Sequence, residues 1–259
     1  MATVINDFIK KYQIANIDFI SSHGHTVYHQ PEENYTFQLG NRIELRELIK
    51  KPIVCDFRVQ DVALGGQGAP LVPIGDLLLF KDFSHCINLG GFCNISIKND
   101  SQIIAYDICP VNVVLNYLSK KIGFSFDKDG NHAKSGSVNK QLLKDLNQIE
   151  YYVEEPPKSL GIEWVKENIF KIIDNYNITN EDKLRTYTEH ICSQIAVNID
   201  GDHPQILFTG GGVKNKFLMA RLSKKMKKKF QLPEIEIIDF KEALIFSFLG
   251  ILKVRNEMK

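Results

Sequence analysis

The sequence predicts an α/β protein of two domains, and three observations support this. The 259 residues, 44% of them hydrophobic, are enough for two cores of ordinary size. An apolar run at residues 52–57 has the length and β-branched content of a buried strand, and it leads into a glycine-rich stretch. From His85 a second series of strands and helices begins. A pattern that starts afresh in this way indicates a second domain with its own sheet.

Charge, cysteine content and hydropathy exclude several classes of protein. Lys and Arg number 32 against 31 Asp and Glu, so the charge suggests no nucleic-acid or membrane partner. The five cysteines are odd in number and mostly lie in apolar runs, as expected of reduced core residues. The amino-terminal MATVINDFIKKYQ lacks the apolar core of a secretion signal, and no apolar run approaches the ~18 residues that span a bilayer. We therefore expect a soluble protein of the cytoplasm.

Helices and strands alternate in the part that precedes the glycine-rich stretch. The expected elements are helices over residues 3–12 and 41–50 and strands over 18–21, 35–39 and 52–57. The segment SSHGHTVYHQP is expected to be a loop. Its three histidines show no recognisable metal-ligand spacing, so a polar histidine in a substrate pocket fits better than a metal site. The strand over 35–39 carries Gln38.

The stretch DFRVQDVALGGQGAPLVP is the candidate chemical centre. The preceding strand delivers Arg58 and Asp61 to the start of a loop. Three glycines follow within four positions, namely Gly65, Gly66 and Gly68. Such a density lets the backbone take left-handed conformations and approach a ligand closely. A carboxylate beside a glycine-rich turn at the carboxyl end of a strand is a usual place for a general base, although a turn-rich connection with a solvated Asp is the alternative.

The segment HCINLGGFCNISIKNDSQIIAYDI predicts a β-meander of three strands, the last ending at Asp107. Gly90 and Gly91, followed by Asn94, could form a nest of N–H groups for phosphate oxygens, but a plain hairpin explains the glycines equally well. A helix is expected over 111–122. The polar segment FDKDGNHAKSG resembles a calcium loop only superficially, because the required downstream Glu is missing.

The last third contains a second glycine-rich turn. After helices over 162–176 and 181–199, QILFTGGGVKN predicts a strand, three glycines and a helix start, which together form an anion or nucleotide platform. It is not a Walker loop, because no Gly-Lys-Ser/Thr follows. A short strand over 234–238 and a buried helix from Phe240 end the chain. Glu242, near that helix start, is either a dipole partner or a ligand contact.

Seven motifs occur in an order that resembles the anhydro-N-acetylmuramic acid kinase family: SHGHTVYHQP, TFQLGN, CDFRVQDVALGGQGAPLVP, INLGGFCNIS, PPKSLG, FTGGGVKN and KEALIFSFL. The resemblance covers nearly the whole chain. It implies the actin-like/sugar-kinase fold, an α/β fold of two ribonuclease-H-like domains with a nucleotide cleft between them. The domains implied are the remainder of a first domain with the sugar site over 1–82, a second domain with the nucleotide site over 83–239, and a terminal helix over 240–259 at the domain interface.

The resemblance also implies an activity and a set of site residues. The family opens the internal anhydro bond of 1,6-anhydro-N-acetylmuramic acid with water and transfers the γ-phosphoryl group of ATP to its 6-oxygen, with magnesium as cofactor. Asp61 would be the base that activates water, and Arg58 would order the site. Sugar contacts are implied for His23, Gln38 and Glu242. Nucleotide contacts are implied for Gly90, Gly91, Asn94, Asp107, Gly210, Gly211, Gly212 and Asn215.

Two departures from the family pattern leave alternatives open. The usual amino-terminal hairpin of the form MSGTSLDG is not in this sequence, so the resemblance implies an amino-terminally truncated chain with an incomplete first domain. The common DTGPGN is replaced by DICPVN, and two lost glycines remove close backbone approach there. The alternatives are a catalytically incomplete fragment that binds sugar or a partner chain, and a hydrolase using Asp61 and Glu242. The expected partners are the sugar and ATP, without nucleic acid or membrane, and a homodimer is left open.

Overall fold

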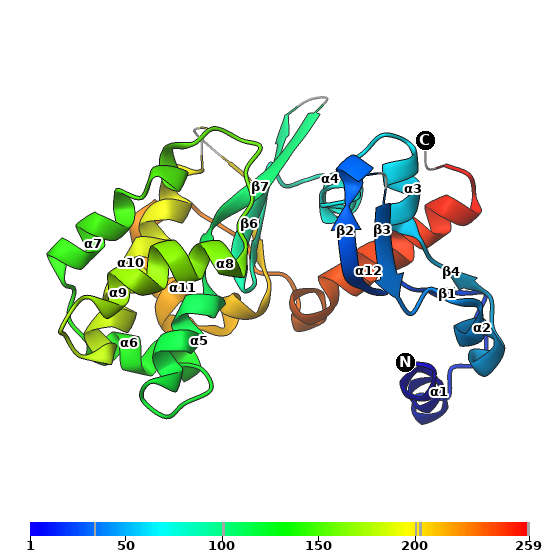
Figure 1. The fold of residues 1–259 in the computed structure, drawn as a ribbon, viewed down its shortest axis with the longest axis horizontal. Coiled ribbons are helices and arrows are strands. Elements are labelled where there is room, and N and C mark those ends of the chain that lie inside the picture. Colours follow the sequence, from blue (N-terminus) through cyan, green and yellow to red (C-terminus); the bar gives the residue numbers. More distant parts are fainter. Residues whose placement is uncertain (34, 100–101, 200, 202–203, 258–259) are drawn as a thin grey trace. The chain divides into compact units, whose positions relative to one another are not determined.

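The computed structural model describes residues 1–33, 35–99, 102–199, 201 and 204–257 (Figure 1). The chain divides into two compact units. The first unit consists of Met1–Leu79 and Glu242–Lys259, and the second of Phe80–Lys241. The assignment of these stretches to ribonuclease-H-like domains with the boundaries given above stays a prediction.

The first unit contains two small sheets and five helices or parts of helices among its described residues. β1 (Ile20–Ser21) pairs in parallel with β4 (Ile53–Val54), and β2 (His25–Gln30) pairs antiparallel with β3 (Tyr35–Leu39). A 3₁₀-helical turn at Pro31–Glu33 precedes the connection to β3. The helices are α1 (Ala2–Lys11), α2 (Ile43–Ile49), α3 (Phe57–Ala63), α4 (Val72–Leu79) and the later part of α12 (Ile235–Val254).

The core of the first unit forms where α3, α4 and α12 meet. Phe57, Ile245, Phe246 and Leu249 are buried there. Gly75 of α4 packs directly on α12, because a Cβ at this position would lie 2.5 Å from Cγ1 and Cγ2 of Ile245. This core fixes α3, the helix that carries the candidate base.

The second unit is built on a four-stranded sheet with the strand order β7-β6-β5-β8. The strands are β5 (His85–Leu89), β6 (Phe92–Asn99), β7 (Gln102–Pro110) and β8 (Ile206–Thr209). β5, β6 and β7 are antiparallel neighbours, so the predicted meander is confirmed, whereas β8 runs parallel to β5. Because β5 and β8 are parallel, the turns that follow them meet at one edge of the sheet.

Helices and short turns complete the second unit. The helices are α5 (Asn112–Lys120), α6 (Asn131–Ser135), α7 (Lys140–Asn147), α8 (Ile162–Val165), α9 (Lys171–Asp174), α10 (Asn180–Val197) and α11 (Lys216–Met226). The 3₁₀-helical turns are Lys128–Gly130, Glu150–Val153 and Gly211–Lys214, and Lys166–Phe170 is a π-helical turn between α8 and α9.

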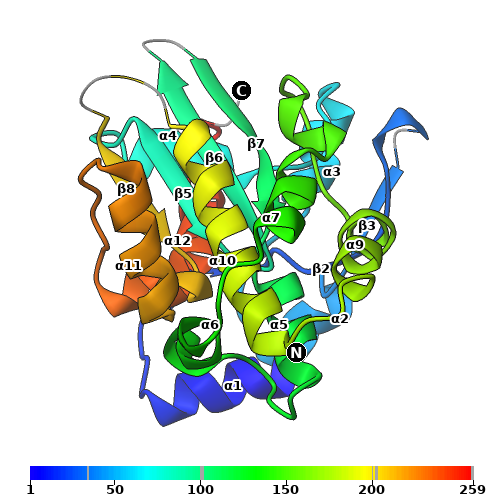
Figure 2. The same cartoon turned by 90° about the vertical axis from the view of Figure 1, so that its left-hand side faces the viewer.

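The long helix α10 lies across one face of the sheet (Figure 2). It begins where the Thr179 hydroxyl accepts a hydrogen bond from the Asp182 N–H at 3.1 Å. Leu184, Tyr187 and Ile191, at helical spacing, are fully buried in the core of the unit. This packing holds the sheet edge that carries the glycine turns.

Several predictions of local structure are wrong. The strand expected over 52–57 is limited to β4, and Arg58 and Asp61 lie on helix α3 instead of at the start of a loop. The physical reason is at Asp56, whose left-handed backbone (φ 61°) interrupts the extended chain after β4 and forms the amino-terminal cap of the helix.

Three further boundaries differ from expectation. The expected loop after the first strand contains β2, because its residues pair with β3. The strand expected over 234–238 is helical, since α12 begins at Ile235; the kink at Phe240 (φ −126°) marks the predicted helix start. β7 continues past Asp107 to Pro110. The turn expected at Asn99-Asp100 falls partly outside the described residues.

Candidate active site

Helix α3 places Arg58 and Asp61 on neighbouring positions of one face, because residues three apart on a helix lie side by side. Phe57 and Val62 are buried and hold the helix in position. At the helix start, the Asn41 side chain donates to Oδ1 of Asp56 at 3.1 Å, which steadies the left-handed residue. The backbone before the two charged residues is therefore fixed.

The glycine-rich turn after α3 wraps the Asp61 carboxylate. The Gly68 N–H donates to Oδ2 of Asp61 at 2.7 Å. A Cβ at Gly66 would overlap the same oxygen, so no side chain fits there without displacing the carboxylate. Oδ1 of Asp61 has no hydrogen-bond partner among the described residues. One carboxylate oxygen is thus held in place, and the other can accept a proton.

Arg58 binds the same turn from the other side. Its Nη1 donates to the Gly68 carbonyl at 2.7 Å, and its Nη2 lies 2.8 Å from Nε2 of His23. Since a guanidinium can only donate, Nε2 of His23 accepts and the imidazole proton lies on Nδ1. Nε of Arg58 is buried and has no partner within the described part of the chain. Arg58 therefore has a donor left over for a ligand.

His23, Arg58 and Glu242 of the first unit lie close enough for their charges to interact. Burial lowers the pKa of His23, the positive charge of Arg58 lowers it further, and the negative charge of Glu242 opposes both effects. Burial also lowers the pKa of Arg58, again opposed by Glu242. The imidazole ring packs 4.1 Å from the ring of Phe246. His23 is thus neutral at pH 7 and Glu242, which is exposed, supplies negative charge nearby.

Gln38 is the third residue predicted to contact sugar, and it is only 4% exposed. Its Nε2 donates to the Thr36 hydroxyl at 2.7 Å, but its Oε1 has no partner among the described residues. A Cβ at Gly24, the residue after His23, would lie 3.0 Å from Cβ of Gln38, so the two segments touch. A buried acceptor without a partner costs about 1–3 kcal/mol, which a ligand hydroxyl or amide would offset.

In the second unit, the structure brings the two predicted glycine turns together. Gly90 and Gly91 follow β5, and the turn from Gly210 to Gly212 follows β8. A Cβ at Gly210 would overlap Oδ1 of Asn88, and one at Gly212 would lie 2.7 Å from Cβ of Leu89. The backbones therefore pack without room for side chains. Gly211 has no atom within 4 Å of its Cβ position and leaves an open side for a ligand.

A row of polar side chains crosses the sheet beside these turns. Asn94 is the direct strand partner of both Asn88 and Asp107, so the three side chains project from the same face. Oδ2 of Asp107 accepts from the Leu160 N–H at 2.9 Å, and burial raises the pKa of this carboxyl group. Asn88 was not predicted as a site residue. Its pairing with Asn94, two positions before the Gly90 turn, is the signal that could have identified it.

Asn112 fastens the first glycine turn and was not predicted as a site residue either. Its Nδ2 donates to the carbonyls of Gly90 at 2.7 Å and Leu89 at 3.3 Å. This residue ends the DICPVN segment. Cys109 and Val111, which replace the family glycines, are fully buried in the core. The effect of this replacement on the site stays a prediction.

Asn215 caps helix α11 at the end of the second glycine turn. Its Oδ1 accepts from the Leu218 N–H at 3.0 Å. The 3₁₀-helical turn Gly211–Lys214 leads directly into this cap. The N–H groups near the start of α11 and the helix dipole favour a negatively charged group at this edge.

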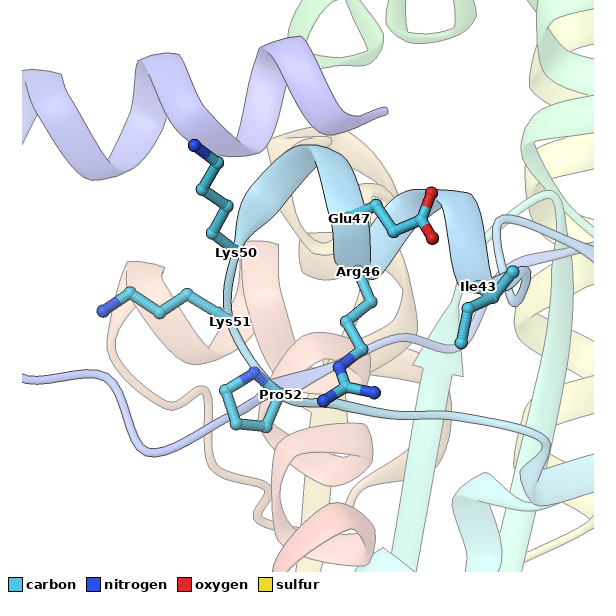
Figure 3. Close-up of a pocket in the computed structure, with 6 residues that line it drawn as sticks. All are labelled: Ile43, Arg46, Glu47, Lys50, Lys51 and Pro52. Atoms are coloured by element: carbon cyan, nitrogen blue, oxygen red, sulfur yellow. The ribbon is translucent and has the colours of Figure 1, made fainter.

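A pocket of 360 Å³ is lined by residues of α2 and the turn after it (Figure 3). The lining residues are Ile43, Arg46, Glu47, Lys50, Lys51 and Pro52, none of which was predicted for a site.

None of the described helices combines the length and the apolar character needed to cross a membrane.

Comparisons with known proteins identify the relatives of this chain. Residues 1–257 match the family described as anhydro-N-acetylmuramic acid kinase. The anhydro-N-acetylmuramic acid kinase of Pseudomonas syringae pv. syringae is 36% identical over 258 residues, covering 91% of this chain and 68% of the relative. That of Sulfurimonas denitrificans is 33% identical over 276 residues, covering 96% of this chain and 73% of the relative.

Among solved structures, the activator of the 2-hydroxyisocaproyl-CoA dehydratase from Clostridium difficile, with bound ADPNP, matches with a TM-score of 0.50. It is 11% identical, and the match covers 100% of this chain and 84% of that one. At this identity the likeness concerns the fold alone, and it confirms the predicted α/β, actin-like/sugar-kinase fold class. The match of the family over nearly the whole chain shows that the chain belongs to the anhydro-N-acetylmuramic acid kinase family.

Proposed function

We propose that the protein is an ATP-dependent kinase that opens 1,6-anhydro-N-acetylmuramic acid with water and phosphorylates its 6-oxygen. The product would be N-acetylmuramic acid 6-phosphate, an intermediate of peptidoglycan recycling. Family membership supports the reaction class. The observation that carries the chemistry is the Asp61 carboxylate, with Oδ2 held by the Gly68 N–H at 2.7 Å and Oδ1 without a partner in the described chain.

In the proposed reaction, water attacks the anomeric carbon of the sugar while Oδ1 of Asp61 takes its proton. The bond between the anomeric carbon and the 6-oxygen breaks, and its electron pair stays on that oxygen. The 6-oxygen then takes the γ-phosphoryl group of ATP, and ADP leaves. A carboxylate positioned in this way typically contributes about 10²–10⁴-fold to the rate.

The other residues of the first unit would bind and orient the sugar. Arg58, fixed between Gly68 and His23, has a buried Nε–H that can donate to a sugar oxygen. Gln38 offers an unpaired buried oxygen to a hydroxyl or to the N-acetyl N–H. Glu242, exposed and close enough to influence both Arg58 and His23, would accept from a sugar hydroxyl. These donors and acceptors suit a polar sugar better than an apolar ligand.

The second unit would hold the nucleotide. The turn from Gly210 to Gly212 and the cap at Asn215 offer backbone N–H groups, and Gly211 is open toward a ligand. Asn88 and Leu89, which precede Gly90, pack against this turn. Gly90 and Gly91 would contact the phosphates together with Asn94. Phosphoryl transfer depends mainly on such positioning and on stabilisation of negative charge.

The residues of the second unit are compatible with a magnesium ion that binds together with the nucleotide. Among the described residues no group of three or more His, Cys, Asp or Glu is placed to hold a metal. Asp107 and Asn94, however, are strand partners with oxygen donors of the kind that magnesium prefers, and magnesium commonly combines one carboxylate with phosphates and water. When bound, it would neutralise phosphate charge. The proposed reaction consumes ATP, and we propose a cytoplasmic location for the protein.

The test is formation of sugar phosphate from 1,6-anhydro-N-acetylmuramic acid, ATP and magnesium, followed by mass spectrometry. Asp61→Asn is expected to lower the rate by about 10²–10⁴-fold and leave sugar affinity, measured by calorimetry, nearly unchanged. Asp7→Asn, an exposed carboxylate on α1, is the control and should keep full activity. Ring opening without ATP would favour the hydrolase, and sugar binding without any product would favour the non-catalytic fragment.

A further inference from the structure

The segment FDKDGNHAKSG, which the proposed reaction does not use, contains the 3₁₀-helical turn Lys128–Gly130 and the short helix α6. Residues Asp127–Gly136 are here called the anchored turn. Asp127 is buried, and its two carboxylate oxygens accept from the N–H groups of His132 and Ala133, each at 2.9 Å. Both oxygens are thus engaged within the turn. A charged acceptor on two N–H groups is among the stronger hydrogen-bonded arrangements in proteins.

The far end of the anchored turn is fixed to helix α10. A Cβ at Gly136 would overlap the Glu181 carbonyl oxygen, so the backbones are in direct contact. The next N–H, of Ser137, donates to Oδ1 of Asp182 at 2.6 Å, and the N–H of Asn139 donates to the Thr186 hydroxyl at 2.9 Å. Because α10 is the buried central helix of the unit, these contacts give the anchored turn a fixed base (Figure 2).

The tip of the anchored turn meets the end of the second glycine turn. Gly130 has a φ of +72° and is buried. A Cβ on Gly130 would overlap Oδ1 of Asn215 and lie 2.6 Å from Cβ of Phe217. The same Oδ1 caps α11 by accepting from Leu218. A second link joins Oδ1 of Asp129 to the Lys216 ammonium group at 3.4 Å.

We propose that the anchored turn positions Asn215 and, through it, the nucleotide-binding turn from Gly210 to Gly212. Gly130 and Asp127 are then positioning residues for nucleotide affinity. This inference rests on the proposed function, because it takes the second glycine turn to bind the nucleotide. The requirement at position 130 is twofold: a left-handed φ and the absence of a side chain between the turn and the cap.

The experiment compares two left-handed glycines in the full chain. Gly130→Ala adds a methyl group that must displace Asn215, whereas Gly123→Ala, at φ +87°, meets no atom within 4 Å. Both variants carry the same kind of backbone strain. We expect Gly130→Ala to weaken binding of a non-hydrolysable ATP analogue with magnesium by about tenfold in calorimetry, equivalent to about 1.4 kcal/mol. Gly123→Ala should bind it within about twofold of the original chain, and sugar affinity should stay unchanged in both.

A second variant covers the case in which Gly130→Ala does not fold. Asp127→Asn puts an NH₂ group against one of the two N–H donors and loosens the turn without adding volume. It should weaken analogue binding by about threefold or more and leave sugar affinity unchanged. Equal nucleotide affinity in the Gly130 and Gly123 variants, or an equal loss of sugar and nucleotide affinity in Asp127→Asn, would overturn the inference. Failure of the unaltered chain to bind the analogue would overturn the proposed nucleotide site, and the inference with it.

Discussion

The N–H of Gly68 donates to Oδ2 of Asp61 at 2.7 Å, so a backbone group seven residues further along the chain orients the candidate base. A carboxylate that is already oriented in this way loses less conformational entropy when it takes up the geometry needed for proton transfer. The surrounding glycine turn should therefore tolerate no displacement of the side chain.

The first prediction concerns Gly66. A methyl group here would overlap the Asp61 carboxylate, so Gly66→Ala is expected to lower kcat by about 100-fold, as a displacement of about 1 Å can do. Sugar binding, which depends on Arg58 and Gln38, should change much less. Gly65→Ala is the comparison, because it strains the backbone at φ +88° but meets no atom within 4 Å. A larger kcat loss in the Gly65 variant would contradict the prediction.

The second prediction concerns Arg58. Arg58→Lys keeps the positive charge but cannot reach both the Gly68 carbonyl and His23 with fixed geometry. We expect kcat/KM for the sugar to fall by about 10–100-fold. Steady-state kinetics with varied sugar would measure it, and the KM for ATP should stay constant. Arg46→Lys, in the pocket beside α2, is the matched control and should behave like the original chain.

The third prediction concerns Asn112 in the second unit. Asn112→Ala removes the hydrogen bonds to Gly90 and Leu89 that fasten the first glycine turn. The KM for ATP is expected to rise by about three- to tenfold, corresponding to about 1 kcal/mol. Asn116→Ala, four residues further along α5, is the control. A rise in the KM for sugar of the same size would argue against a role confined to the nucleotide side.

The fourth prediction concerns pH and the buried His190. Burial lowers its pKa to about 3, and its ring nitrogens lie 2.7 Å from Oδ1 of Asn147 and 3.0 Å from the Tyr152 hydroxyl. In the unfolded chain a histidine has a pKa of about 6.5. Between these two pKa values the histidine of the unfolded chain binds a proton and the buried His190 of the folded chain does not. A falling pH therefore favours the unfolded state, and the free energy of unfolding decreases from its value above pH 6.5. The expected slope is about 1.4 kcal/mol per pH unit.

Denaturant unfolding at about pH 4–6, between the two pKa values, would measure this slope. His190→Gln should be less stable at pH 7, because it disturbs a buried polar network, but its stability should depend less on pH. His25→Gln, with an exposed ring, should keep the slope of the original chain. Identical slopes in the original chain and the His190 variant would refute the assignment.

Asp61 and the glycine turn of the candidate site could be singled out from the sequence, but their local structure could not be predicted, and the role of Asp61 as base stays a prediction. The apolar run before Asp61 suggested one strand reaching Phe57. The chain leaves that strand because Asp56 adopts a left-handed conformation, and no periodicity in the sequence marks such a single residue. The β-meander was predictable because its strands pair locally through short turns.

Contacts between distant segments escaped prediction for a different reason. Asn88 looks like an isolated polar residue within an apolar strand until pairing sets it beside Asn94. The contact between Gly130 and Asn215 joins segments far apart in the chain, and spacing rules describe only neighbours along a helix or strand. The roles proposed for His23, Gln38 and Glu242 came from the family resemblance, and these roles stay predictions.

Gly68 offers both of its backbone polar groups to side chains of opposite charge, its N–H to Asp61 and its carbonyl to Arg58. Removing either charged side chain leaves the other bound to a glycine whose second backbone group has lost its partner. Substitutions at the two positions should therefore be strongly non-additive. A mutational scan of this chain should therefore show Arg58, Asp61 and Gly68 to be coupled. A substitution at one of these positions would change which substitutions the other two tolerate.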